Sequence, residues 1–322
     1  MYTGVRHPDP SARILVVRLG AMGDIIHTLP AVASLKHSIS GSHLTWVVEP
    51  QWAPLLDGNP YVDERILLDR DSATALMRSR RDLQREPFDF AVDFQGLMKS
   101  ALVASTARAQ KIFGFDSSQA RESAAAIFYS NRTLSTALHV VDRNLDLARA
   151  AGAVNPLHVF PIPAGEAGQP LPEGDFVLAC PLAGWGSKQW PLESYTQLAK
   201  KLKMPLVVNG PPSGVDTLDR IEGAYRHISG LPGLIYATRR ATAVIGVDSG
   251  PLHLAAALDK PGVAIFGPTD PERNGPYGKS MQVLRSRDAG TSYKRRAETD
   301  ESMRAITPNA VLAALESQLQ PA

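Results

Sequence analysis

The residues best suited to chemistry lie where an apolar run turns into a helix, within Gly246–Leu258. The residues from Ala243 are apolar and β-branched enough to predict a buried strand, and those from Leu252 are good helix formers. Ser249 suits the N-cap of that helix, and Pro251 suits its first turn, where a missing N–H costs nothing. A helix start favours an anion through its free N–H groups and its dipole. The spacing therefore predicts a phosphate site.

Further polar residues extend this predicted site. Gly250 lets a ligand approach the backbone, and His253 is a possible donor one turn into the helix. A polar loop that contains Thr269 follows the next predicted strand, Val263–Phe266. For Ser249 or His253 alone, helix capping or local packing is the simpler interpretation. Two polar loops at successive strand ends favour one shared ligand.

A third polar loop follows the predicted strand Phe176–Cys180. Gly184 and Gly186 permit close approach to the backbone, and Lys188 is a mobile point charge suited to a diphosphate. A loop lysine is usually exposed to solvent, but this one lies in the same half of the chain as the predicted phosphate site. That coincidence favours phosphate contact. We expect Trp190 and Pro191 to anchor the loop by packing.

In the first half of the chain, the segment Arg18–Pro30 is another glycine turn that enters a helix. Gly20 and Gly23 are three residues apart with no earlier glycine, so the dinucleotide fingerprint G-x-G-x-x-G is poorly supported. Asp24 lies where this helix begins. It is either a favourable placement at the positive end of the dipole or a general base directed at a hydroxyl. The spacing alone leaves both interpretations open.

Polar residues also follow the predicted strand Phe88–Phe94. Asp93, Gln95 and Lys99 should lie near one edge of the sheet, where they can hydrogen-bond a sugar or a carboxylate. A solvated surface charge is the simpler interpretation of a lone lysine. Arg121 either grips an acidic acceptor bidentately or pairs with neighbours at the surface.

Composition limits the class of protein. The 322 residues, 44% of them hydrophobic, are enough for two domains with substantial cores. The formal charge of +2 gives no bulk attraction to nucleic acid. The single cysteine, Cys180, ends an apolar run, which favours a buried structural thiol over a nucleophile. Without a signal-type or membrane-spanning segment, we expect a cytoplasmic protein, and attachment to a membrane surface stays open.

A basic run, Arg78, Arg80, Arg81 and Arg85, lies in a helical stretch of the first half. Most charge runs are solvated faces, and neighbouring acidic residues dilute this one. The run can still meet acidic headgroups, at about 1 kcal/mol for each basic side chain near an anionic surface. The eight histidines show no spacing typical of a metal site, so we expect no metal and no cofactor.

Strand-like runs alternate with helical segments along the whole chain, which predicts two doubly wound, parallel α/β domains. The predicted strands are Ile14–Val17, Leu44–Val48, Phe88–Phe94, Phe176–Cys180, Leu206–Val208, Ala243–Val247 and Val263–Phe266. Ligands of such sheets bind at the carboxyl ends of the strands, so two facing domains would share a site in the cleft between them. The expected divisions are a flexible N-terminus (1–12), a first domain (13–155), a proline-rich linker (156–172), a second domain (173–304) and a packed C-terminal helix (305–322).

Several segments in order along nearly the whole chain together resemble one known family. They are Met22–Pro30, Phe94–Ser100, Gly184–Pro191, Val247–His253 and Phe266–Pro271. These segments are similar to the lipopolysaccharide heptosyltransferases of glycosyltransferase family 9. The Gln95–Leu97 segment, and Arg121-Glu122 with Phe128-Tyr129, resemble the type I enzymes more than type II.

This resemblance implies a fold, an activity and a set of site residues. The fold would be GT-B, with two Rossmann-like domains facing across a cleft, the first for the acceptor and the second for the nucleotide sugar. The activity would be inverting, metal-independent transfer of heptose from ADP-heptose to the Kdo sugar of lipid A in lipopolysaccharide core synthesis, with contact at the inner membrane surface. Asp24 takes the place of the general base and Lys188 that of the donor phosphate contact. The nucleotide-sugar site would comprise Gly184, Ser187, Lys188, Asp248, Ser249, Gly250, His253 and Thr269, and the acceptor site Gly23, Asp93, Gln95, Lys99 and Arg121.

The sequence departs from the family pattern in two segments, and three rival functions stay open. Many relatives carry a cysteine before the last helix, whereas Ala289–Met303 has none, which argues against a metal or redox role there. Tyr61–Arg85 matches only weakly. Another GT-B transferase or an epimerase is one alternative, and an epimerase would consume the nucleotide sugar without an acceptor. A non-catalytic nucleotide-sugar-binding protein is a second, and an NAD oxidoreductase, which lacks its fingerprint here, is a third.

Overall fold

The computed structural model describes residues 11–292 and 294–320. It divides into two compact units, Met1–Pro161 (unit 1) and Ile162–Ala322 (unit 2). The division falls inside the range 156–172 that we expected to be a linker. The expected flexible N-terminus, 1–12, lies almost wholly outside the described residues.

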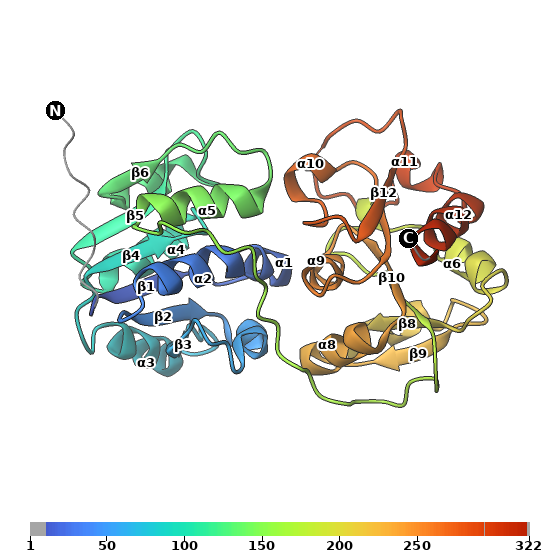
Figure 1. The fold of residues 1–322 in the computed structure, drawn as a ribbon, viewed down its shortest axis with the longest axis horizontal. Coiled ribbons are helices and arrows are strands. Elements are labelled where there is room, and N and C mark those ends of the chain that lie inside the picture. The colour runs from blue at the N-terminus through green and yellow to red at the C-terminus, as the bar shows by residue number, and fades with distance from the viewer. Residues whose placement is uncertain (1–10, 293, 321–322) are drawn as a thin grey trace. The chain divides into compact units, whose positions relative to one another are not determined.

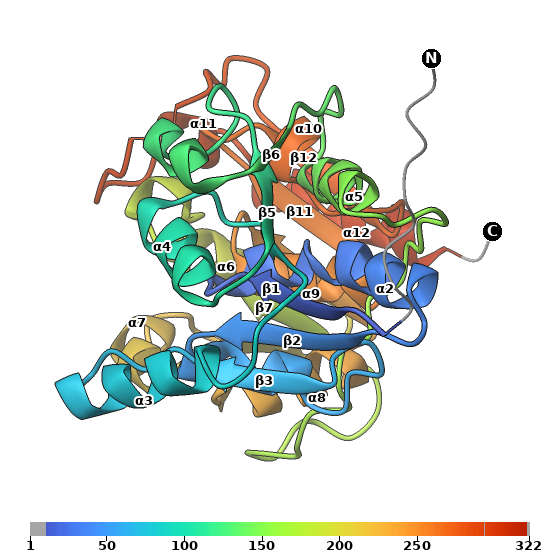
Figure 2. The same cartoon turned by 90° about the vertical axis from the view of Figure 1, so that its left-hand side faces the viewer.

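Unit 1 is a parallel six-stranded sheet in the order β3-β2-β1-β4-β5-β6, with helices on both faces (Figures 1 and 2). Its strands are β1 (Arg13–Val17), β2 (His43–Val48), β3 (Glu64–Leu67), β4 (Phe90–Asp93), β5 (Lys111–Phe115) and β6 (Asn131–Thr133). Its helices are α1 (Met22–Ile26), α2 (Leu29–Ser38), η1 (Pro50–Leu56), α3 (Ala73–Leu83), α4 (Met98–Thr106), η2 (Ser123–Phe128) and α5 (Val140–Ala150), with η marking 3₁₀ helices. Figure 2 shows α3 and α4 on one side of this sheet and α2 and α5, which pack together, on the other.

Unit 2 repeats the plan with a parallel sheet in the order β12-β11-β10-β7-β8-β9. Its strands are β7 (Val177–Cys180), β8 (Leu206–Gly210), β9 (Tyr225–Ile228), β10 (Ala243–Val247), β11 (Gly262–Phe266) and β12 (Met281–Arg285). Its helices are η3 (Gly186–Lys188), α6 (Leu192–Ala199), η4 (Pro212–Gly214), α7 (Val215–Leu218), α8 (Leu231–Arg240), α9 (Gly250–Ala257), α10 (Pro271–Asn274), α11 (Glu301–Arg304) and α12 (Pro308–Leu319). The predicted pair of doubly wound α/β domains is therefore confirmed.

The strand register decides which loops emerge together. In unit 1, Val17 at the end of β1 pairs with Val47 of β2 and with Asp93 of β4, so the loops that follow these strands leave the same edge. In unit 2, Gly246 of β10 pairs with Cys180 of β7 and with Ala264 of β11. Polar loops separated by tens of residues in the sequence thus meet at the carboxyl edge of each sheet.

All seven predicted strands are present, and five more strands were missed: β3, β5, β6, β9 and β12. Cys180 is buried, as predicted, and burial raises the pKa of its thiol to about 12. The predicted C-terminal helix is α12. Thr307 caps it by accepting a hydrogen bond from the Ala310 N–H, and Val311 and Leu315 are buried against unit 2.

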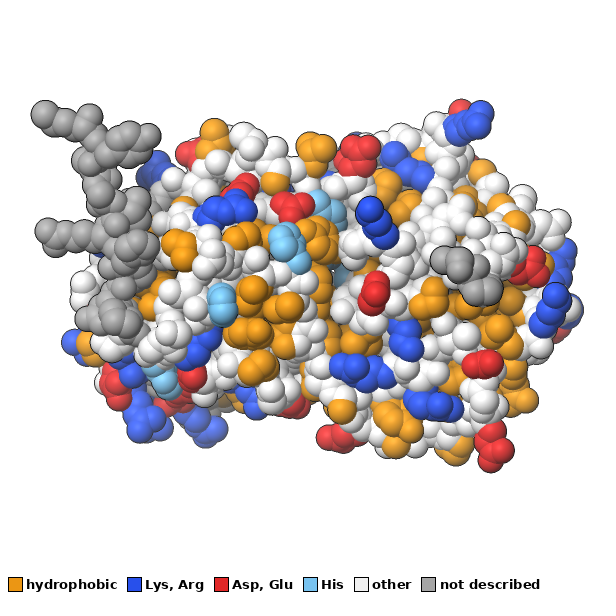
Figure 3. Space-filling model, in the orientation of Figure 1, with side chains coloured by type: hydrophobic (Ala, Val, Ile, Leu, Met, Phe, Trp, Pro, Cys, Tyr) orange, Lys and Arg blue, Asp and Glu red, His pale blue; other side chains and the backbone are white. Residues whose placement is uncertain are grey.

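The surface shows no strong charge separation on the face drawn in Figure 3, where basic and acidic side chains are interspersed, in keeping with the net charge of +2. No helix in the described part of the chain has the length and apolar character that crossing a membrane requires.

Candidate active site

Three residues that the sequence placed in one phosphate site do meet in unit 2. Lys188, at the end of η3, and Asp248, after β10, form an ion pair with 2.5 Å between Nζ and Oδ2. His253, in the first turns of α9, lies with Nε2 at 3.8 Å from Oδ1 of the same carboxylate. The lysine is 16% exposed and the aspartate 7%. The ammonium group is thus largely withdrawn from water at the start of a helix, where an anion is favoured.

The loops that follow β7, β10 and β11 also carry buried hydroxyl groups without partners. The side-chain oxygens of Ser187, Ser249 and Thr269 are buried, and none hydrogen-bonds to any described residue. Ser249 is the N-cap of α9 by position, yet its side chain makes no capping hydrogen bond. A buried hydroxyl left unpaired costs about 1–3 kcal/mol. Three such groups on three loops indicate a ligand rich in hydrogen-bond acceptors.

Two glycines of the loop after β7 differ in whether packing of the protein requires glycine at their position. A Cβ on Gly186 would lie 1.7 Å from the carbonyl oxygen of Ala297, so packing within unit 2 requires glycine there. A Cβ on Gly184 would meet nothing within 4 Å, so the protein itself does not require glycine at that position. Close approach of a ligand at Gly184 stays a prediction. Trp190 anchors the loop as expected: it is buried, and its Nε1 donates to the Ile306 carbonyl at 2.8 Å.

In unit 1, Asp24 is held by two arginines. Its Oδ1 lies 2.8 Å from Arg18 Nη2 and 2.6 Å from Arg121 Nη2. Arg121 is 46% exposed, whereas Arg18 is only 2% exposed. Burial raises the pKa of Asp24, but the charges of Arg18 and Arg121 outweigh it, and the pKa falls below its ordinary value. Asp24 is therefore an ionised carboxylate.

Arg18 is a site residue that our sequence reasoning missed. It directly follows β1, and its guanidinium also donates to the Phe94 carbonyl. A buried arginine is costly unless it is paired, so its fixed position beside Asp24 indicates a built ion pair. The available signal was a charged residue directly after an apolar strand.

Asp93 has a different role from the direct acceptor contact that we predicted. It is fully buried and accepts hydrogen bonds from Tyr129 Oη and Ser100 Oγ, at 2.7 and 2.8 Å, and from the Gln95 N–H at 2.8 Å. Burial raises its pKa despite these donors. Both carboxylate oxygens of Asp93 are occupied by donors of the protein itself, which leaves none for a substrate. Asp93 instead holds the loop between β4 and α4 in shape.

Gln95 also holds a loop in shape, and its direct contact with an acceptor stays a prediction. It is 4% exposed, and its Oε1 accepts the Leu19 N–H at 2.8 Å, which ties the β4 loop to the β1 loop. Gly96, at φ +66°, packs against the backbone of Arg121 and so fixes the segment that carries this arginine. Gly23 is buried in α1 and presents no side chain. The predicted acceptor-site residues that reach solvent are thus Lys99 and Arg121.

Lys99 is one of two cations that pair with a second carboxylate, that of Glu49. Glu49, after β2, lies 3.3 Å from Lys99 Nζ and 2.6 Å from Arg70 Nη2. Glu49 is 15% exposed, while both cations are about half exposed, at 43% and 51%. Together with Asp24, this gives two carboxylates and four cations at one sheet edge. The edge is suited to an acidic ligand.

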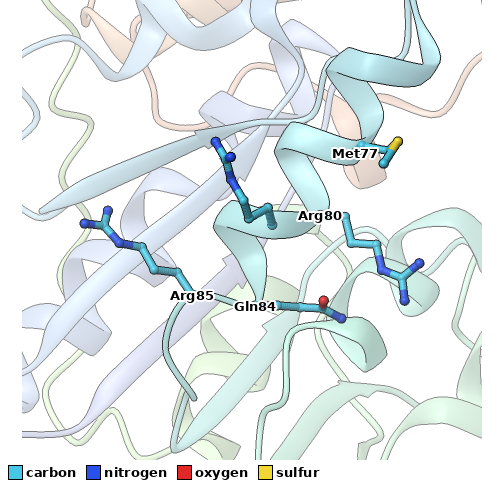
Figure 4. A pocket seen from close by; sticks show the side chains of 5 residues that line it. Met77, Arg80, Gln84 and Arg85 are labelled. Carbon is cyan, nitrogen blue, oxygen red and sulfur yellow. The ribbon is translucent and has the colours of Figure 1, made fainter.

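The predicted basic run lies on α3 and just beyond its end. Arg80, Arg81 and Arg85 line a surface hollow together with Met77 and Gln84 (Figure 4). Met77 is 71% exposed, which is unusual for an apolar side chain. The hollow therefore combines apolar and cationic groups.

In the described part of the chain, no cluster of three or more His, Cys, Asp or Glu side chains can hold a metal ion.

Known proteins share this fold and this sequence pattern. The sequence profile of glycosyltransferase family 9 (heptosyltransferase) matches residues 76–304. Lipopolysaccharide heptosyltransferase 1 of Escherichia coli K12 is 30% identical over 302 residues, which cover 85% of this chain and 93% of that one. The E. coli heptosyltransferase WaaC, solved with ADP, superposes with a TM-score of 0.78 at 26% identity, covering 95% of this chain and 99% of that one. Its structure with ADP-2-deoxy-2-fluoro heptose gives 0.77 at 28% identity, with the same coverage.

The fold and these matches define the class as a glycosyltransferase of the GT-B fold. Within that class, the chain belongs to glycosyltransferase family 9, the heptosyltransferases. The resemblance noted from the sequence is confirmed.

Proposed function

We propose that this protein transfers heptose from ADP-heptose to a Kdo residue of lipid A during lipopolysaccharide core synthesis, with inversion at the transferred carbon and without a metal. The observation that carries the proposal is the Lys188–Asp248 pair at the start of α9, together with the unpartnered buried hydroxyls on the neighbouring loops of the same sheet edge. The relatives named above are lipopolysaccharide heptosyltransferases, and two of their structures hold ADP or an ADP-heptose analogue.

On the donor side, the leaving group is a diphosphate, and its negative charge grows as the sugar bond breaks. Lys188 and the N-terminus of α9 stabilise that charge, and Ser187, Ser249 and Thr269 donate hydrogen bonds to phosphate oxygens. The carboxylate of Asp248 holds Lys188 in place and is free to accept from sugar hydroxyls. These groups supply the charge stabilisation for which other transferases use a divalent cation, which is the basis for proposing a metal-independent reaction.

On the acceptor side, Asp24 is the general base that takes the proton of the attacking hydroxyl. Its position among Arg18, Arg121, Lys99 and Arg70 suits an acceptor that carries its own carboxylate or phosphates. A base that acts on the face opposite the leaving diphosphate leads to inversion.

The low pKa of Asp24 makes it a weak base in the free protein. An acidic acceptor competes with Asp24 for Arg121, which is the exposed partner of the two arginines. When Arg121 turns to the acceptor, the pKa of Asp24 rises, and the carboxylate becomes a better proton acceptor. Acceptor binding and base activation are thus coupled through one guanidinium.

We propose further that the protein attaches to the anionic face of a membrane through α3. This rests on Arg80, Arg81 and Arg85 around the exposed Met77, because cationic groups meet acidic headgroups while an apolar side chain enters the interface.

The donor assignment is tested by the affinity for ADP, measured by calorimetry. Lys188→Ala should weaken ADP binding by roughly 10- to 100-fold, because a charge-assisted contact is lost. Lys200→Ala removes an equal charge from an exposed pair with Glu222 and should leave the affinity unchanged. An unaltered affinity in Lys188→Ala, or no ADP binding by the unmodified protein, would refute the assignment.

A further inference from the structure

The connection from β12 to α11 is tied to two of the three polar loops of the unit 2 site. Ser292 donates its N–H to the Pro268 carbonyl at 2.6 Å, and the Ser187 N–H donates to the Arg296 carbonyl at 3.1 Å. Gly186 and Ala297 are in direct backbone contact, as the glycine requirement shows. We call residues 294–297 the strap. It is held beside the loop that carries Ser187 and Lys188.

The strap brings a second cation to that loop. Lys188 Nζ lies 4.2 Å from the centroid of the Trp185 ring, and Arg295 Cζ lies 5.6 Å from the same centroid. Both distances are within the range of a cation–π contact. One indole ring thus holds a lysine from its own loop and an arginine from more than a hundred residues further along the chain.

The net charge of the Lys188–Asp248 pair leaves a role for a second cation at a phosphate site. Lys188 is neutralised by Asp248 at 2.5 Å, so the pair presents no net charge to a ligand. A nucleoside diphosphate ester carries about two negative charges on its phosphates, and burying unbalanced charge is costly. Arg295 is exposed and forms no ion pair with any carboxylate of the described residues, so its charge is available.

We propose that Arg295 is a second phosphate-binding cation for the nucleotide-sugar donor, and that Trp185 is the residue that positions it beside Lys188. This inference rests on the proposed function. Arginine suits the task because its planar guanidinium donates two parallel hydrogen bonds to phosphate oxygens. The role of the strap is then to hold a donor-binding side chain beside the loop that carries Lys188.

The test is isothermal titration of the full-length protein with ADP and with adenosine. Arg295→Ala should weaken ADP binding about 10-fold, because one charge-assisted contact is lost, and should leave adenosine binding unchanged, because adenosine has no phosphate. Arg295→Lys should recover part of the loss. Arg287→Ala is the matched control, since Arg287 is an exposed arginine of the same connection, and it should stay within about twofold of the unmodified protein.

Trp185 provides a second, independent variant. Trp185→Phe keeps an aromatic face and should retain most of the ADP affinity, whereas Trp185→Leu should lose about as much as Arg295→Ala. Thermal melts of all variants without ligand establish that the fold is kept.

The possible outcomes separate this inference from the proposed function. If the unmodified protein binds no ADP, the proposed function fails and the inference falls with it. If it binds ADP and Arg295→Ala binds equally well, only the role of Arg295 is overturned. An equal loss in Arg287→Ala, or an equal loss of adenosine binding, would also overturn that role, because it would show a general charge effect or a contact with the base.

Discussion

Asp24 shows how one carboxylate is set up by its neighbours. Arg18 is buried, while Arg121 is 46% exposed. The same carboxylate therefore has one counter-charge inside the protein and one that a ligand can reach from solvent. Sequence patterns predicted Asp24 and Arg121 as site residues, but nothing in the spacing showed that they bond to each other across 97 positions.

Replacing the proposed base tests its role. Asp24→Ala should lower turnover by roughly 100-fold or more, the usual contribution of a general base, when ADP release is followed at saturating donor and acceptor. Asp71→Asn, at an exposed position of unit 1, should leave turnover unchanged. Near-normal turnover in Asp24→Ala would rule out the role.

The pH dependence tests the arginine pairing. The folded-state pKa of Asp24 is below its ordinary value, so its ion pairs stabilise the fold at pH above that value, and this stabilisation is lost as pH falls through the folded pKa. Arg121→Ala removes one of the two cations and should shift the acid limb of kcat/KM to higher pH, while KM for an acidic acceptor rises about 10-fold. An acid limb at the same pH in both proteins would contradict the coupling.

At the scale of elements, central strands were predictable and edge strands were not. Strands such as β1, β10 and β11 are continuous apolar runs because a parallel sheet buries both of their faces. The missed strands β3, β6, β9 and β12 are the four sheet edges, and charged or polar residues interrupt them, as in Glu64-Arg65 of β3. The fifth, β5, lies next to an edge and begins at the exposed Lys111.

The β4 loop depends on a buried network that sequence spacing could not reveal. Tyr129→Phe removes the Oη–H donor to Asp93 and should lower the free energy of unfolding by about 1–2 kcal/mol in urea titrations. Tyr225→Phe is the control, because Tyr225 is 59% exposed, and it should change little. Equal stabilities of the two variants would show that the Asp93 network does not hold the loop.

Reversing charges on α3 tests the proposed membrane attachment. Arg80→Glu with Arg81→Glu should greatly reduce co-sedimentation with phosphatidylglycerol vesicles, since each reversed charge repels the surface. The control is Lys200→Glu with Lys201→Glu, an equal charge change in unit 2, which should sediment as the unmodified protein does. Membrane attachment through α3 would be excluded by unchanged sedimentation of the arginine variant, or by equal binding to neutral phosphatidylcholine vesicles.

At the scale of the molecule, each unit carries its own chemistry. Unit 2 has the features of a phosphate site, and unit 1 has a sheet edge at which two carboxylates pair with four cations. The alternation of strands and helices along the sequence predicted both sites, because the ends of parallel strands share an edge. The sequence patterns missed Arg18, Glu49 and Arg70, and they did not show that donors of the protein occupy Asp93, because burial and long-range pairing are properties of the folded chain.

The proposed heptose transfer is tested most directly by following the reaction itself. The purified protein is supplied with ADP-heptose, with or without Kdo-lipid A, in buffer that contains a chelator of divalent cations, and released ADP is measured alongside the mass of the lipid. We expect ADP release only with acceptor, one heptose added to the lipid, and a rate that the chelator does not lower. Consumption of ADP-heptose without acceptor, or no transfer at all despite ADP binding, would contradict it.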